Sequence, residues 1–163
     1  KGIQNEGMHY TGFIFIGLIK VKGEPYVIEY NVRMGDPETE VVFPRIKSDI
    51  LELFLALETE TFPLLQIDID PRVASTVMLV SGGYPLAYEK NAPIIGLDDV
   101  SESLVFHAGT KNLNNKTVTN GGRVLAITSY GSTINNATKN CYEEISKIFF
   151  EGMYYRKDIG FDL

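Results

Sequence analysis

The chain has 163 residues, of which 44% are hydrophobic and 22% are charged, and its formal net charge at pH 7 is −6. This apolar content is typical of a folded globular protein and excludes wholesale disorder. A single cysteine excludes a disulfide scaffold and a cysteine-based zinc site within the sequence, and it favours a reducing, cytoplasmic compartment. The acidic charge, without a basic block, argues against nucleic acid or a membrane as partner. No apolar run approaches the ~18 residues of a membrane-spanning helix.

The first sixty residues predict two antiparallel strands and a helix. A β-prone run covers Tyr10–Val21, and the turn-forming residues Lys22–Pro25 separate it from a second strand over Tyr26–Arg33. A helix is expected to begin near Ser48 and Asp49, which can cap it. Apolar residues follow at helical spacing: Ile50, Leu51, Phe54 and Leu57.

A polar stretch that contains Pro63 and Pro71 interrupts this pattern, and we place a domain boundary there. The expected domains are residues 1–62 and 63–163. Short β-prone runs follow the boundary: Val73–Val80, Leu104–His107, Thr117–Thr119 and Arg123–Thr128.

The last part of the chain predicts a hairpin and then a helix. The sequence Asn120-Gly121-Gly122 predicts a hairpin turn between the strands at Thr117–Thr119 and Arg123–Thr128. From Ser132 onward the pattern is helical. One face of this helix is expected to carry Ile134, Ala137, Cys141, Ile145 and Ile148. The predicted fold class is therefore α+β.

The strand expected over Tyr26–Arg33 carries the residues most suited to chemistry. Since alternate residues of a strand share a face, Glu29, Asn31 and Arg33 are expected on one side. Carboxylate and amide oxygens are ligands that Mg²⁺ prefers, and a guanidinium beside them can hold a phosphate or a carboxylate. The alternative is a half-buried strand whose polar face is simply solvated.

The loop Gly35-Asp36-Pro37-Glu38 follows this strand and adds two further acidic side chains. It is either part of the same site or an ordinary turn.

Other candidates have structural explanations that are at least as good. The segment Ser81–Pro85 is a glycine-rich turn that lacks the lysine of a P-loop. His107 fits the edge of a sheet, and Cys141 fits the core face of the last helix. Arg123, which follows the predicted glycine turn, is a minor candidate for an anion contact.

At Glu29–Glu38 the sequence resembles the last strand and loop of the ATP-grasp domain in the phosphoribosylamine–glycine ligase family, also called glycinamide ribonucleotide synthetases. Met34 stands where that family usually has Phe, and Phe43 where it has Leu; neither is a proposed ligand. A lone Glu-x-Asn is weak evidence, whereas an ordered set of strings is specific. The further strings in the family's order are Val42–Asp49, Ser81–Pro85, His107–Thr110, Thr119–Leu125 and Gly152–Gly160.

The resemblance implies the C-terminal part of an ATP-grasp domain, made of antiparallel strands and a helix, followed by a small mixed α/β domain. It also implies an enzyme that joins glycine to 5-phosphoribosylamine in de novo purine synthesis. In that reaction ATP phosphorylates the glycine carboxylate, and the amine then displaces phosphate from the enzyme-bound glycyl phosphate. The implied products are glycinamide ribonucleotide, ADP and phosphate.

The same resemblance implies roles for individual residues. Glu29 and Asn31 hold Mg²⁺ or Mn²⁺, and Arg33 stabilises the transferring phosphoryl group. The pocket for glycine or the amine is lined by Gly35, Asp36 and Glu38. The implied ligands are ATP, glycine and 5-phosphoribosylamine, and the full-length enzyme is expected to be a cytoplasmic monomer.

The resemblance covers only the C-terminal portion of that enzyme, and the first residue is Lys1 rather than Met. We therefore expect a longer parent protein and no activity from these residues alone. Two alternatives stay open. Another ATP-grasp ligase, such as a carboxylase subunit, shares Glu-x-Asn and the arginine but not the Gly-Asp-Pro-Glu continuation. A free-standing β-rich binding module would instead have a natural mass near that of this chain.

Overall fold

The computed structural model describes residues 2–59 and 61–161, so Lys1, on which the expectation of a longer parent depends in part, lies outside the described residues. It contains two compact units. The first runs up to Thr39 and includes Ile46–Ile69, and the second comprises Glu40–Arg45 and the chain from Asp70 onward. The domain assignment 1–62 and 63–163 stays a prediction. Within the described residues, no helix is long and apolar enough to cross a membrane.

The first unit contains the expected hairpin, formed by β1 (Phe15–Val21) and β2 (Glu24–Asn31). Its turn is Lys22-Gly23, with φ of 52° and 91°, as a two-residue type I′ turn requires. The predicted turn was therefore too long, because Pro25 lies within β2. A two-stranded sheet tolerates this proline since each strand has a free edge.

Both strands are shorter at their outer ends than the sequence predicts. β1 begins at Phe15 rather than at Tyr10, and Gly12 before it has a φ of 146°, which is outside the extended region of ordinary residues. β2 ends at Asn31, and Arg33 lies in a bend. The prediction that Arg33 belongs to the strand is therefore wrong.

Helix α3 (Ile50–Glu58) begins where the sequence predicts. The Asp49 carboxylate accepts a hydrogen bond from the Leu51 N–H at 2.8 Å and caps the helix. The predicted face is only partly correct, because the helix buries Leu53 and Ala56, whereas Phe54 is 43% exposed. The first unit also contains the short helices α1 (Gly2–Asn5) and η2 (Phe62–Leu64).

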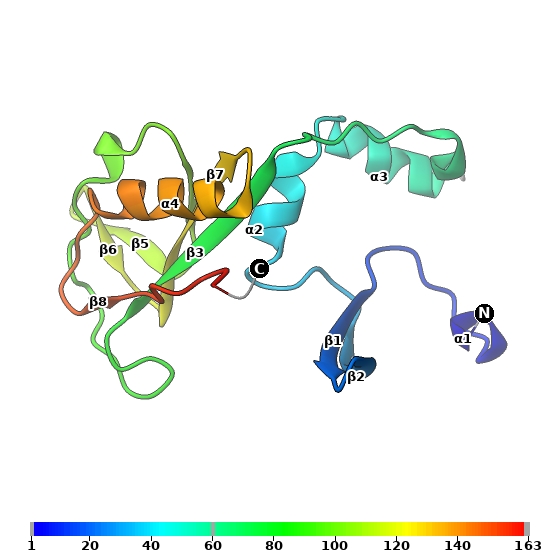
Figure 1. Cartoon of the computed structure of the whole chain (residues 1–163), viewed down its shortest axis with the longest axis horizontal. Coiled ribbons are helices and arrows are strands. Elements are labelled where there is room, and N and C mark those ends of the chain that lie inside the picture. Colours follow the sequence, from blue (N-terminus) through cyan, green and yellow to red (C-terminus); the bar gives the residue numbers. More distant parts are fainter. Residues whose placement is uncertain (1, 60, 162–163) are drawn as a thin grey trace. The chain divides into compact units, whose positions relative to one another are not determined.

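The second unit is built on an antiparallel sheet of order β4-β7-β3-β8. Helix α4 packs on β7 and β3 and lies across the sheet in Figure 1. The strands are β3 (Val73–Ser81), β4 (Leu104–His107), β7 (Arg123–Gly131) and β8 (Met153–Tyr154). The second unit also contains η1 (Phe43–Arg45), η3 (Leu97–Asp99) and most of α2 (Thr39–Val42), which begins in the first unit.

The core of the second unit lies between this sheet and α4 (Ile134–Ile145). Thr133 caps the helix by accepting from the Asn136 N–H at 3.2 Å. The predicted face is buried at Ala137, Cys141 and Ile145, which are fully inaccessible. Ile148 is also buried, but it follows the end of the helix. The sheet contributes Val77, Leu79, Val124, Leu125 and Ile127 to the same core.

The glycine segment after Thr119 does not form the predicted hairpin turn. β6 (Lys116–Thr119) pairs with β5 (Thr110–Leu113), a strand the sequence analysis missed, rather than with β7. The turn of that hairpin is Asn114-Asn115, with φ of 52° and 60°. Asparagine tolerates this left-handed backbone, which two-residue hairpin turns need.

Gly121 serves a close approach between chain segments instead of a hairpin turn. A Cβ on Gly109 would lie 2.6 Å from the Gly121 Cα, so neither position accepts a side chain. The Gly109 N–H donates to the Arg123 carbonyl at 2.8 Å, and the Ser81 N–H donates to the Gly122 carbonyl at 2.8 Å. The glycines therefore let three loops meet at one end of the sheet.

Glu144 is a buried acid of α4, with 5% of its surface exposed. Its Oε2 accepts from the backbone N–H groups of Ser101 at 2.9 Å and Glu102 at 3.4 Å, and its Oε1 accepts from Lys147 Nζ at 2.6 Å. Burial alone would raise the pKa of this carboxyl, but the hydrogen bonds from Lys147, Ser101 and Glu102 outweigh it and lower the pKa. Glu144 thus ties the loop before β4 to the helix.

The variant Glu144→Gln is expected to lower the free energy of unfolding by about 1–2 kcal/mol at neutral pH, because it removes charge-assisted hydrogen bonds. Since the pKa is lower in the folded state, the stabilisation is present above the pKa of an unfolded glutamate, about 4.3, and is lost as the pH falls through the folded value. Urea denaturation of the wild type and of Glu144→Gln, at neutral pH and at about pH 3, measures this difference in stability. A difference that is unchanged at low pH would contradict a role for the charge.

Candidate functional site

Glu29 and Asn31 lie next to each other on one face of β2. Asn31 Nδ2 donates a hydrogen bond to Glu29 Oε1 at 2.9 Å, so the two side chains meet. Asn31 is half-buried and Glu29 is exposed. The face-sharing predicted from strand alternation is thus present for this pair, while their role as metal ligands stays a prediction.

The neighbouring strand leaves room for this pair. Gly17 lies opposite Glu29 and Phe15 lies opposite Asn31. A Cβ on Gly17 would lie 3.0 Å from the Glu29 Cγ, closer than ordinary contacts. Since opposite residues of an antiparallel pair project from the same face, a side chain at Gly17 would require the Glu29 side chain to shift.

Arg33 is separated from this pair by the end of the strand. Its Nη1 donates to the carbonyl of Met34 at 3.0 Å, and its side chain is exposed. Strand alternation therefore does not place the guanidinium beside Glu29. The sequence predicted otherwise because the apolar and polar alternation continues through Val32, although the backbone bends there.

The loop Gly35–Glu38 is a tight turn that leads into α2. The carbonyl of Gly35 accepts hydrogen bonds from Thr39, from its N–H at 3.1 Å and from its Oγ1 at 2.6 Å. Gly35 is buried, and a Cβ there would overlap the Glu38 carboxylate and lie 3.2 Å from the Phe15 ring. Asp36 and Glu38 are exposed. The loop is a turn, as one interpretation held, and it also presents two carboxylates to solvent.

The donor chemistry of Glu29 and Asn31 fits a magnesium-type cation. The pair supplies one carboxylate and one amide, and no group of three or more His, Cys, Asp or Glu side chains within the described residues could hold a metal. Mg²⁺ is commonly held by one or two protein oxygens, with water and phosphate oxygens completing its shell. Ligation by Asn31 requires its amide to present the oxygen in place of the NH₂ group.

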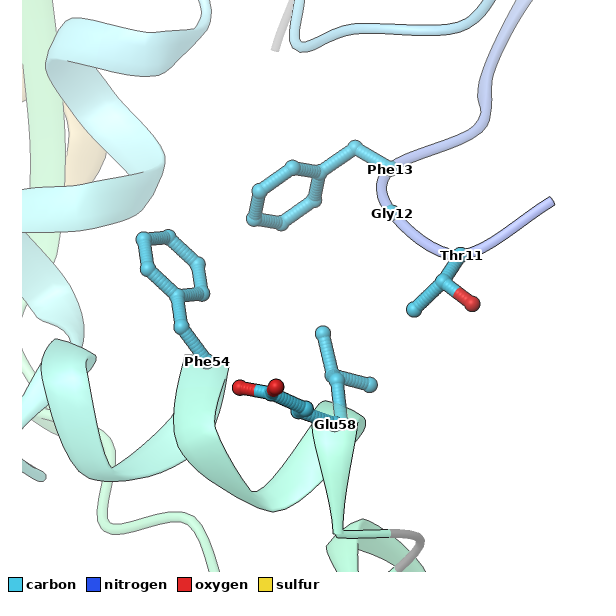
Figure 2. Close-up of a pocket in the computed structure, with 6 residues that line it drawn as sticks. Thr11, Gly12, Phe13, Phe54 and Glu58 are labelled. Carbon is cyan, nitrogen blue, oxygen red and sulfur yellow. The ribbon is translucent and has the colours of Figure 1, made fainter.

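A pocket in the first unit was not foreseen from the sequence. It is lined by residues 11–13 on one side and by Phe54, Leu57 and Glu58 of α3 on the other (Figure 2). The rings of Phe13 and Phe54 meet edge to face, with centroids 6.1 Å apart. The sequence did not indicate this pocket, because residues 11–13 continue the β-prone pattern and were expected in the strand, whereas β1 begins only at Phe15.

The remaining candidates have structural roles. His107 lies on the edge strand β4 and its Nδ1 is 3.0 Å from Thr110 Oγ1, which agrees with a sheet-edge histidine. Cys141 is fully buried, and burial raises the pKa of its thiol, which agrees with core packing. The turn at Ser81–Pro85 reverses the chain, with the Tyr84 N–H donating to the Ser81 carbonyl at 3.1 Å.

Comparison with known proteins identifies both parts of the chain. The sequence model of "Phosphoribosylglycinamide synthetase, ATP-grasp (A) domain" matches residues 1–39, and that of "Phosphoribosylglycinamide synthetase, C domain" matches residues 74–162. The residues proposed as metal ligands and substrate contacts, 29–38, all lie within the first match.

Similar proteins share the name phosphoribosylamine–glycine ligase. The "Phosphoribosylamine--glycine ligase" of Vibrio parahaemolyticus is 43% identical over 99% of this chain and 38% of its own length. That of Fusobacterium nucleatum is 42% identical over 98% of this chain and 38% of its own length. The crystal structure of the Thermotoga maritima protein of that name has a TM-score of 0.77 and 39% identity, over 96% of this chain and 39% of that one.

The chain thus spans about two fifths of the length of these relatives. Its α+β architecture matches that of the solved structure across almost its whole length. Since the C-domain match alone covers more than half of the residues and the A-domain match covers the segment with Glu29 and Asn31, the chain belongs to the phosphoribosylglycinamide synthetase family.

Proposed function

We propose that this chain forms the C-terminal part of an ATP-dependent ligase that joins glycine to 5-phosphoribosylamine. The observation that carries the proposal is the meeting of the Glu29 and Asn31 side chains on β2, directly before the Gly35–Glu38 loop, within the segment matched by the ATP-grasp domain. The name printed for the similar proteins, phosphoribosylamine–glycine ligase, supports the substrate assignment.

Glu29 and Asn31 would hold the divalent cation, Mg²⁺ or Mn²⁺. When bound, this cation neutralises charge on the ATP phosphates. The Glu29 carboxylate supplies the negative charge of the site, and the amide of Asn31 supplies a neutral oxygen. Because the pair is open to solvent, it leaves space for phosphate oxygens in the same shell.

The residues after β2 would act on the reacting groups. In the proposed reaction the glycine carboxylate attacks the γ-phosphorus of ATP, and ADP leaves. The amine of 5-phosphoribosylamine then attacks the carbonyl carbon of glycyl phosphate, so that the amide bond forms and phosphate leaves. The positively charged guanidinium group of Arg33 would stabilise charge on the transferring phosphoryl group.

Gly35, Asp36 and Glu38 would line the pocket for glycine or the amine. The exposed carboxylates of Asp36 and Glu38 are suited to hold an ammonium group, and the buried Gly35 lets the Glu38 side chain fold back over the turn. Such contacts position the reactants, which is the main contribution a protein makes to phosphoryl transfer.

ADP release by the full-length protein tests this proposal. With ATP, Mg²⁺, glycine and freshly made 5-phosphoribosylamine present, we expect steady release, and omission of any one of the four is expected to abolish it. The 163-residue chain assayed alone is expected to release no ADP. A coupled enzymatic assay for ADP, with product identified by mass spectrometry, provides the measurement.

The outcomes of this assay separate the alternatives. Release that ignores glycine but responds to another carboxylate donor would support a different ATP-grasp ligase. No release from a verified full-length protein would favour the β-rich binding module. Light scattering of the same protein tests the expectation of a monomer.

A further inference from the structure

The hydroxyl of Tyr10 joins two segments that are distant in the sequence. Its oxygen lies 2.7 Å from the carbonyl oxygen of Phe13 and 2.9 Å from that of Val32. A tyrosine hydroxyl has a single proton, so Tyr10 donates to these two acceptors in competition or shares the proton between them. The segment before β1 is thereby tied to the residue directly after β2.

Gly12 is what allows the Tyr10 hydroxyl to occupy this position. A Cβ on Gly12 would lie 2.8 Å from the Tyr10 hydroxyl oxygen and 3.2 Å from the ring carbon that carries it. Gly12 also has a φ of 146°, a backbone angle that residues other than glycine rarely adopt. Tyr10 and Gly12 therefore form one unit, which we call the Tyr10 latch.

The latch holds the backbone at the point where β2 ends. Val32 lies between Asn31, the last residue of the strand, and Arg33, which lies in the bend. A hydrogen bond to the Val32 carbonyl fixes the orientation of the peptide plane between Val32 and Arg33, and this constrains the backbone that leads from Asn31 through Val32 to Arg33. The latch thus acts on the backbone of the segment from Asn31 to Arg33.

We propose that Tyr10 is a positioning residue of the ligase site, which holds the Val32 carbonyl so that Asn31 and Arg33 project in the orientation the reaction requires. This inference rests on the function proposed above. Tyr10 belongs to no helix or strand and is 41% exposed, so its hydroxyl serves no ladder or core contact. Its hydrogen-bond acceptors are instead a neighbouring carbonyl and the carbonyl between two proposed site residues.

The variant Tyr10→Phe in the full-length protein removes the hydroxyl and keeps the ring. We expect kcat to fall about tenfold and the Mg²⁺ concentration for half-maximal activity to rise several-fold, since small displacements of positioned groups have large kinetic effects. A loss of folded protein alone would lower the apparent kcat and leave the Mg²⁺ dependence unchanged. The matched control is Tyr26→Phe, an exposed tyrosine within β2.

A second measurement does not depend on activity. Hydrogen exchange of the full-length protein without ATP or metal, followed by mass spectrometry, reports on the backbone around residues 32–34. We expect faster exchange there in Tyr10→Phe and in Gly12→Ala, which displaces the hydroxyl from the other side, and wild-type exchange in Tyr26→Phe. The double variant is expected to resemble the single variants, because both remove the same bond.

Wild-type Mg²⁺ dependence and wild-type exchange in Tyr10→Phe would overturn the inference. The wild-type protein and Glu29→Gln are assayed in parallel. If the wild type is active and Glu29→Gln is not, a null result for Tyr10→Phe removes only the latch. If the wild type shows no glycine-dependent ADP release, the proposed function fails, and the exchange data then report solely on the structure of the latch.

Discussion

Replacing Glu29 with glutamine in the full-length protein is expected to lower turnover at least about 100-fold, the loss seen when an electrostatic contact to the reacting group is removed. Glutamine has nearly the same shape as glutamate but lacks its charge, so a divalent cation loses its anionic ligand. The fold is expected to persist, since Asn31 Nδ2 can still donate to an Oε1 atom at position 29. Steady-state kinetics across a range of Mg²⁺ concentrations measures the effect.

The control for this experiment is Glu24→Gln. Glu24 is the first residue of β2, pairs with Val21 across the hairpin and is exposed. The Glu24→Gln substitution removes one carboxylate charge from the same strand, but at a position seven residues before Asn31. Circular dichroism of both variants checks the fold. Near-normal activity of Glu29→Gln at ordinary Mg²⁺ would remove Glu29 from the metal site.

Replacing Gly96 with alanine is expected to lower the free energy of unfolding by more than about 3 kcal/mol. Gly96 has a φ of 82°, and its Cβ would overlap the carbonyl oxygen of Lys147 and lie 2.8 Å from the carbonyl carbon. Backbone atoms cannot rotate away as a side chain can. Ile95, directly before Gly96, exchanges backbone hydrogen bonds with Phe149 at 2.9 and 3.1 Å, so a shift at Gly96 also disturbs this bridge.

The matched control, Gly152→Ala, separates the two causes. Gly152 has a similar φ of 72°, but its nearest atom would be the Gly82 nitrogen at 3.6 Å, an ordinary contact. The free energy of unfolding of Gly152→Ala is expected to fall only by the cost of the left-handed backbone, about 1–2 kcal/mol. Urea denaturation of the two variants provides the comparison. Equal losses in both would show that the approach to Lys147 has no effect.

Local patterns were sufficient to predict several of the helices and strands. The glycine and turn residues between two β-prone runs predicted the β1–β2 hairpin, and Asp49 predicted the start of α3. Apolar spacing identified the buried face of α4 at Ala137, Cys141 and Ile145. These features depend on interactions between residues that are close in sequence, which composition and spacing record.

The errors occurred where a distant residue competes with the local signal. Asn120-Gly121-Gly122 has the sequence of a hairpin turn, but Gly109 packs against Gly121 and the segment connects two sheets instead. Arg33 continues the alternation of β2, but the strand ends at Asn31. The Tyr10 hydroxyl, 22 residues away from Val32, holds the bend that follows.

Family membership was predictable from the order of short strings. The shared strand face of Glu29 and Asn31 was also predictable, because the pleat alone relates two residues at this spacing. The latch around Tyr10, the close approaches of Gly17 and Gly96 and the pairing of β5 with β6 emerged only from the folded structure. Apart from the β5–β6 hairpin, whose Asn114-Asn115 turn is local, each of them depends on atoms from segments at least twelve residues apart in sequence. Their proximity results from packing and hydrogen bonding across the whole chain, which no local pattern encodes.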